Sequence, residues 1–265
     1  MTPESRKTAR WLAAQYAKRR PFQAFPPGLA PADLTAAYAA QDAFVALKAR
    51  VCGPVAGWKI ALSNPAMQQM VGLASPVSGR LHQRQLVGGP ARVSASAYGR
   101  LIIEFEIAVE IGADINPPGG RCSPELAARS VAAVRPAFEI ADDRNADYAS
   151  LSHHALQMVA DNAWTQGAVL GERRTDWRAL DLAALRGEVL CNGETVGEGF
   201  GRDLMGHPMN ALAWLASHAD GRGTPMRVGD IAILGSMITT RFPKPGEHWR
   251  FALDGFPALD LRIDP

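Results

Sequence analysis

The first fifty residues alternate apolar and polar positions with a helical period. From Pro3 to about Arg19, apolar residues recur at helical spacing and basic residues occupy the opposite face. The segment Pro21–Pro31 contains four prolines and a glycine, so it predicts a connection, and the Ala-rich segment Ala32–Val51 predicts a second helix. Residues 1–50 are therefore expected to form a helical N-terminal part, and residues 51–265 the main domain.

From Cys52 onward the chain changes to short apolar runs that are punctuated by Gly, Pro and Asn-Gly, a pattern typical of strands. The predicted strands are Val55–Leu62, Leu101–Ile111, Val134–Ala141, Gly187–Leu190, Glu194–Gly197, Ile231–Ser236, His248–Leu253 and Leu259–Ile263. Asn192-Gly193 predicts a hairpin turn, because both residues accept a positive φ. The predicted helices between the strands are Ser123–Ala133, a segment around Ser150–Asn162, and Pro208–Ala219. This order favours an α+β fold with mixed strands over a regular β-α-β alternation.

Composition narrows the classes of partner. The 28 Lys and Arg residues nearly balance the 26 Asp and Glu residues, so we expect neither a nucleic acid nor a membrane surface as partner, but a small molecule. Three cysteines without a paired spacing argue against a disulfide framework. No apolar run is long enough for a signal sequence or a spanning helix. A cytoplasmic location is expected.

The strand Leu101–Ile111 carries three carboxylates on one face. All its odd-numbered positions are apolar, so Glu104, Glu106 and Glu110 lie together on the other face, and two of these carboxylates lie roughly 7 Å apart along the strand. Neighbouring carboxylates are the ligands that hard cations such as Mg²⁺ or Mn²⁺ prefer. The alternative is an ordinary solvated strand face.

Glu139 interrupts the apolar run Val134–Ala141, and a buried carboxylate must be paired, neutral or bound to a metal. Arg135 or Arg144 could pair with it as a structural bridge. The residue is therefore either a metal ligand or half of an ion pair.

Lys59 is a lone ammonium in an apolar strand, and its neighbours on the same face, Gly57 and Ala61, are small enough to leave room for a ligand. Burial would lower the pKa of the amine toward the range of a general acid or base, and nearby carboxylates would raise it. A lysine that extends its head to the surface is the structural alternative.

Several segments together resemble a known family. They are Gly57–Ser63, Ile103–Ile107, Pro136–Asp142, Asp161-Asn162, Val169–Gly171, Asn192–Glu194, Gly201–Pro208, Ala213–Leu215, Gly229-Asp230 and Leu234–Ser236. In this order and spacing they resemble the 2-keto-4-pentenoate hydratase and 4-oxalocrotonate decarboxylase branch of the fumarylacetoacetate hydrolase superfamily. The resemblance covers nearly the whole chain, including its helical N-terminal part.

The resemblance implies a mixed β-sandwich or roll of the fumarylacetoacetate hydrolase C-terminal type. It also implies that Glu104, Glu106 and Glu139 bind Mg²⁺ or Mn²⁺, that Lys59 takes part in acid-base chemistry, and that the Ser236 region binds the substrate's carboxylate. The implied substrate is a small 2-oxo acid of aromatic catabolism, and the implied assembly is a homo-oligomer. The expected reaction is addition of water to a 2-hydroxydienoate or 2-oxo-enoic acid.

One departure from the family pattern bears on the reaction. Hydratases usually carry an acidic residue two positions before the glycine of the segment Ser75–Gly79, and here Val77 stands there. A 2-oxo-3-enedioate decarboxylase and a C–C hydrolase of the same superfamily are therefore the alternatives. A non-catalytic partner subunit is an alternative of another class, and the retention of Lys59 with the three glutamates argues against it.

Overall fold

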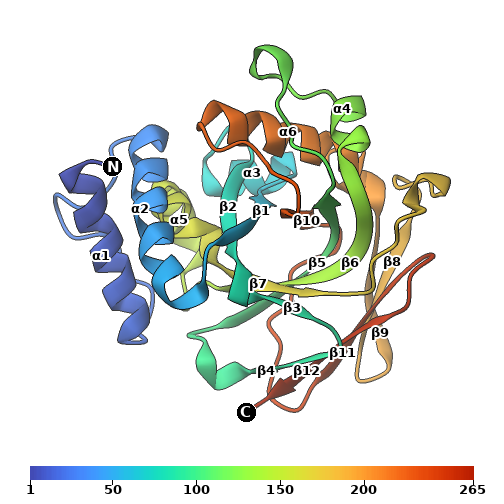
Figure 1. The fold of residues 1–265 in the computed structure, drawn as a ribbon. Helices are drawn as coiled ribbons and strands as arrows, with labels where there is room; N and C mark the ends of the chain where they lie inside the picture. Colours follow the sequence, from blue (N-terminus) through green and yellow to red (C-terminus); the bar gives the residue numbers. More distant parts are fainter.

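Twelve strands form the body of the molecule, and the computed structural model describes them together with the rest of residues 1–265 (Figure 1). The strands are β1 Val55–Ala61, β2 Val77–His82, β3 Leu86–Gly88, β4 Ala91–Ser94, β5 Leu101–Ile111, β6 Val131–Asp142, β7 Thr165–Leu170, β8 Arg186–Cys191, β9 Glu194–Phe200, β10 Ile231–Ser236, β11 His248–Leu253 and β12 Leu259–Asp264. One sheet has seven strands in the order β2-β1-β10-β5-β6-β7-β3, and the other has five in the order β4-β12-β11-β8-β9.

The helices lie outside the sheets. They are α1 Pro3–Ala17, α2 Leu34–Cys52, α3 Pro65–Val71, α4 Pro124–Arg129, α5 Ala155–Ala160 and α6 Pro208–Gly221. Figure 1 shows α1 and α2 side by side, with α5 between this pair and the strands. Thr2 and Asp33 cap the first turns of α1 and α2 by accepting backbone N–H bonds, so both helices begin where the sequence supplies a capping side chain.

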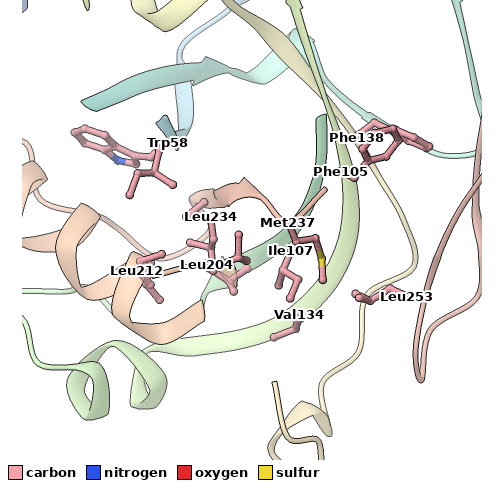
Figure 2. Packing of buried hydrophobic residues seen from close by; sticks show 14 of the residues in the cluster. Trp58, Phe105, Ile107, Val134, Phe138, Leu204, Leu212, Leu234, Met237 and Leu253 are labelled. Carbon is pink, nitrogen blue, oxygen red and sulfur yellow. The ribbon is translucent and has the colours of Figure 1, made fainter. Parts of the chain in front are cut away.

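The main core lies on one face of the seven-stranded sheet, where the five-stranded sheet and helix α6 pack against it. The odd-numbered side chains of β5 point into it, and Phe105 packs against Phe138 of β6 and Phe251 of β11 with ring centroids 5.6 and 5.9 Å apart. Figure 2 shows Phe105 and Phe138 together, with Ile107 and Val134 further along the same strands. Because the odd-numbered side chains of β5 point into this core, its glutamates, which stand at even-numbered positions, lie on the opposite face of the sheet.

The seven-stranded sheet rolls up, so that β2 approaches β7 although they lie far apart in the strand order. A separate small cluster fills the inside of this roll with residues from five strands. Its members are Leu81, Ala108, Ala137, Ala168, Leu170, Ile231 and Ile233. The glutamate face of β5 and Lys59 of β1 both point into the roll, because Trp58 and Ile60 occupy the other face of β1.

The α+β class, the helical N-terminal part and the pairing of two sheets confirm the expected architecture. The helix predicted over Ser123–Ala133 is wrong at its end, because α4 stops at Arg129 and Val131 already pairs with Ile111 of β5. The sequence did not predict helix α3 or four of the strands, β2, β3, β4 and β7. The division of the chain at residue 50 stays a prediction, and α2 continues to Cys52.

No helix combines the length and the apolar character needed to cross a membrane.

Truncation of Phe105 should strongly destabilise the protein, since its ring is fully buried and contacts aromatic rings from both sheets. We expect Phe105→Ala to lower the free energy of unfolding by about 3–5 kcal/mol in urea denaturation. The control Val228→Ala, at a side chain that is 62% exposed, should change it by less than about 0.5 kcal/mol. Equal effects of the two variants would contradict this description of the core.

Candidate metal centre

Three glutamates from two neighbouring strands meet inside the roll. Glu104 and Glu106 are two residues apart on β5, and Glu139 of β6 is the direct cross-strand partner of Glu104. Each residue offers a carboxylate oxygen, and these three oxygens lie within 4.8 Å of one another. Antiparallel pairing therefore produces a compact acidic cluster, which we call the carboxylate triad.

Hydrogen bonds fix one oxygen in two of the three carboxylates. Thr240 Oγ1 donates to Glu104 Oε1 at 2.7 Å, and the Gly235 N–H donates to Glu106 Oε2, also at 2.7 Å. Glu106 Oε1 and Glu139 Oε2 have no hydrogen-bond partner, although both side chains are completely buried. Burying a carboxylate oxygen without a hydrogen-bond donor costs free energy, and a bound cation would offset this cost at both atoms.

Lys59 brings an ammonium group to the triad from the far side of the roll. Its Nζ lies 2.9 Å from Glu139 Oε1, and its side chain is only 3% exposed. The surface lysine considered from the sequence is thus excluded. The structural pairing of Glu139 with Arg135 or Arg144 is wrong as well, since Lys59 is the partner of Glu139 and Arg144 pairs with Asp161 at 2.6 Å.

The electrostatic state of the cluster follows from burial and from its unequal charges. Burial raises the pKa of Glu139 to about 7, against the opposing effect of the Lys59 ammonium. Burial and the other two carboxylates raise the pKa of Glu106 well above its usual range. For Lys59, burial works to lower the pKa, but the attraction of the three carboxylates outweighs it and the pKa is raised. One ammonium cannot neutralise three carboxylates, and a divalent cation would balance the charge.

The donor set is suited to a hard cation. Only carboxylate oxygens converge in the triad, and neither His nor Cys is part of it. Oxygen-only sites select Mg²⁺, Mn²⁺ or Ca²⁺ over Zn²⁺ or copper. The unpartnered oxygens of Glu106 and Glu139 supply free lone pairs, so the residues present fit a divalent cation.

Two glycines let the backbone approach the site. A Cβ on Gly79 of β2 would lie 3.0 Å from Lys59 Cγ and 2.8 Å from the carbonyl oxygen of Asn162, so only glycine leaves room for the lysine stem. Gly235 has φ +100°, a conformation that favours glycine, and in it the N–H points at Glu106. Asn162 holds β2 in place through bonds from its side chain to the backbone of Arg80.

Not every predicted residue joins the triad. Glu110 lies on the same strand face, but it pairs with Arg173 at 3.0 Å at the surface. Ser236 lies opposite Glu106 in the pairing of β10 with β5, where its hydroxyl accepts from the Phe105 N–H and donates to the Ile238 carbonyl. Its role in substrate binding stays a prediction. The sequence reasoning missed Thr240, which follows the predicted strand β10 without a motif of its own.

Comparison with known proteins agrees with this description. The family model described as fumarylacetoacetate (FAA) hydrolase C-terminal matches residues 67–264, which is most of the chain. The chain therefore belongs to the fumarylacetoacetate hydrolase C-terminal family.

Curated relatives and solved structures place the chain in more detail. It is 32% identical over 211 residues to the 2-hydroxyhexa-2,4-dienoate hydratase of Comamonas testosteroni, covering 79% of this chain and 78% of the relative. It is 32% identical over 262 residues to the 2-keto-4-pentenoate hydratase 2 of Dechloromonas aromatica (strain RCB), covering 96% and 95%. The 4-oxalocrotonate decarboxylase of Pseudomonas putida G7, solved with magnesium and adipate, has the same fold, with a TM-score of 0.88, 24% identity and coverage of 99% and 98%.

Proposed function

We propose that the protein is a divalent-cation-dependent hydratase that adds water to a small 2-hydroxydienoate or 2-oxo-enoic acid. The observation that carries the proposal is the buried ion pair of Lys59 and Glu139 beside two further carboxylates, which puts a proton-transfer group next to a cation site. Relatives named as hydratases at 32% identity support the same reaction class. We expect the protein to form a homo-oligomer in the cytoplasm.

Glu104, Glu106 and Glu139 would hold Mg²⁺ or Mn²⁺. When bound there, the cation supplies Lewis acidity toward the oxygen atoms of a 2-oxo acid. The residues of the chain then determine how the substrate is oriented and where protons move.

Lys59 is the proton-transfer group of this proposal. Its ammonium can donate a proton to a substrate carbon during ketonisation of the dienol, and the resulting amine can take a proton back. Glu139 at 2.9 Å favours the charged form of Lys59 and fixes the position of its head group. The Ser236 region, opposite Glu106, would receive the carboxylate end of the substrate.

A decarboxylase acting on a 2-oxo-3-enedioate is the second candidate, and Val77 is the observation that favours it. Val77 is 1% exposed on β2, where it pairs with Ala61 at the end of the lysine strand. An apolar side chain at this position can neither bind nor activate water. Decarboxylation would use the same Lys59 and triad and needs no acid to activate water. C–C hydrolysis would also use Lys59 and the triad, but it would need a water site elsewhere.

The fate of two substrates separates these reactions. We would follow enzymatically generated 2-hydroxypenta-2,4-dienoate and 2-oxohex-3-enedioate with Mg²⁺ or Mn²⁺, recording ultraviolet absorbance and carbon dioxide release together. Loss of dienoate absorbance without carbon dioxide is the expected result. Carbon dioxide from the enedioate would instead identify a decarboxylase, and no reaction with either compound would favour the non-catalytic partner subunit.

A further inference from the structure

The rolled sheet has a seam between β2, its first strand, and the start of β7. The two strands approach each other, but they are not neighbours in the hydrogen-bonded order of the sheet. Strand β3 pairs with the second half of β7, from Ala168 to Leu170. No backbone ladder therefore joins β2 to the beginning of β7, and side chains hold the seam together.

Asn162 closes this seam. It lies in the turn directly before β7, and it is completely buried. Its Oδ1 accepts the N–H of Arg80 on β2 at 2.7 Å, and its Nδ2 donates to the Arg80 carbonyl oxygen at 2.9 Å. The side chain thus uses both backbone groups of one β2 residue, as the facing residue of a neighbouring strand would. A carboxamide carries the acceptor and the donor for this double contact on one planar group.

The turn that carries Asn162 is strained. Asn162, Ala163 and Trp164 have φ values of +55°, +46° and +63°, so three consecutive residues other than glycine adopt the left-handed conformation. This conformation costs free energy and persists only where surrounding contacts impose it. Here the contacts are the two bonds to Arg80 and a buried ion pair of the preceding residue, Asp161, at 2.6 Å. Strain of this kind is typical of segments that position functional groups.

The turn reaches Lys59 through Gly79. Gly79 precedes Arg80 on β2 and is the cross-strand partner of Lys59 on β1. A Cβ at Gly79 would lie 2.8 Å from the Asn162 carbonyl oxygen and 3.0 Å from Lys59 Cγ. The turn and the lysine stem therefore lie against the same face of Gly79. A movement of β2 away from the turn would also release the lysine stem.

The other end of the turn leads to Glu139. Strand β7 begins at Thr165, directly after the turn, and it pairs with β6, where Ala168 lies opposite Glu139. Asn162 thus connects the strand beside Lys59 with the strand beside Glu139, across the gap that the strand order leaves open. The 2.9 Å contact between Lys59 Nζ and Glu139 Oε1 therefore depends on how closely the seam is held.

The fold does not depend on Asn162 alone. Gln41 of α2 is also completely buried, and its Nε2 donates to the carbonyl oxygens of Ser78 and Val159, both at 2.8 Å. This second carboxamide ties β2 to α5, three residues before Asn162. It should keep the seam from opening when the Asn162 side chain is removed. What Asn162 adds is the contact next to the lysine.

We propose that Asn162 is a positioning residue for proton transfer: by closing the seam at Arg80, it holds the Lys59 ammonium against Glu139. This inference rests on the proposed function, because it takes Lys59 to be the proton-transfer group. It holds for hydration as well as for decarboxylation, since both reactions would pass protons through Lys59.

A saturated 2-oxo acid tests the proposal without either reaction. In D₂O with Mg²⁺, the amine form of Lys59 would take a proton from C3 of 2-oxopentanoate, exchange it with the solvent and return a deuteron, so that a C3–D bond replaces a C3–H bond. Proton NMR at fixed pD measures the rate of this exchange, with Mg²⁺ alone as the blank. Calorimetry measures the binding of Mg²⁺, and then of 2-oxopentanoate, to the same protein.

The main variant is Asn162→Gly, because glycine adopts a positive φ readily and only the side-chain bonds are lost. We expect the exchange rate to fall about 10- to 100-fold, as a displacement of the lysine head by up to about 1 Å implies. Mg²⁺ and 2-oxopentanoate should bind with wild-type affinity. Asn162→Asp keeps the shape and the acceptor but loses the donor to the Arg80 carbonyl oxygen, so its exchange rate should fall as well. It carries the same test if the glycine variant does not fold.

The matched control is Gln157→Ala. Gln157 of α5 is another buried carboxamide with two backbone bonds, which accepts the Phe25 N–H at 3.0 Å and donates to the Gln23 carbonyl oxygen at 2.7 Å. Its loss should lower the stability of the protein and leave the exchange rate unchanged. An equal loss of exchange in this control would overturn the proposal.

Wild-type exchange in the Asn162 variants also overturns it. So does a loss of Mg²⁺ binding in parallel with exchange, because Asn162 would then support the whole site rather than Lys59. A wild type that does not exchange C3 overturns it too. If the wild type exchanges C3 and the variants are slow, the proposal stands even where the dienoate is not converted, and only the hydratase is then excluded.

Discussion

Replacement of Lys59 by methionine is expected to lower kcat about 10²–10⁴-fold while leaving Mg²⁺ bound. Methionine preserves the apolar stem beside Gly79 but removes the ammonium that lies 2.9 Å from Glu139. Proton transfer then has no donor at the position where the structure provides one. Steady-state kinetics on the dienoate measures the loss of kcat, and a Mg²⁺ titration of the same preparation measures whether the cation still binds.

The matched control for this variant is Lys48→Met. Lys48 is another lysine, half-buried on α2, and its Nζ donates to Gln166 Oε1 at 3.1 Å rather than to the triad. We expect its loss to alter stability with kcat unchanged within a few-fold. If both lysine variants lose activity alike, or if Lys59→Met retains most of its kcat, Lys59 is not the proton-transfer group.

Replacement of Glu139 by glutamine is expected to weaken Mg²⁺ binding at least about 100-fold, because it removes one of three charged ligands and is isosteric. Calorimetric titration of the metal-free protein measures this directly. Glu110→Gln serves as control, since Glu110 lies on the same strand face but pairs with Arg173 outside the triad. A Glu139→Gln protein with wild-type affinity would exclude this carboxylate as a ligand.

The affinity of the wild type for Mg²⁺ should rise with pH through about 7. Burial raises the pKa of Glu139 to about 7 in the metal-free protein, so below that pH the cation has to displace a proton. Above it the carboxylate is already ionised, and this contribution to the pH dependence vanishes. Titrations in buffers of different ionisation enthalpy would detect the released proton, and a pH-independent affinity would contradict the assignment.

The part of the site that depends on local periodicity is predictable from sequence. Glu104 and Glu106 share a face because β5 alternates strictly, and the buried core residues Phe105 and Ile107 confirm the alternation. The contact of Lys59 with Glu139 is not predictable in this way. Strands β10 and β5 lie between β1 and β6 in the sheet, and only its rolling brings the two side chains together.

The missed elements have physical reasons as well. Strand β7 contains Gly167, where a Cβ would lie 2.2 Å from the carbonyl oxygen of Gln85, so close backbone approach has replaced the apolar pattern that marks a strand. Val131 begins β6 because it extends the pairing with β5, which overrides the helical signal of α4. In both cases tertiary contacts decide the local structure.

The central claim is that the carboxylate triad binds a divalent cation that the reaction requires. The most direct measurement is turnover of 2-hydroxypenta-2,4-dienoate before and after complete removal of metal with a chelator, followed by addition of Mg²⁺ or Mn²⁺. We predict no turnover by the stripped protein and full recovery with either cation, with one ion bound per chain. Turnover that is unchanged after stripping would contradict the account.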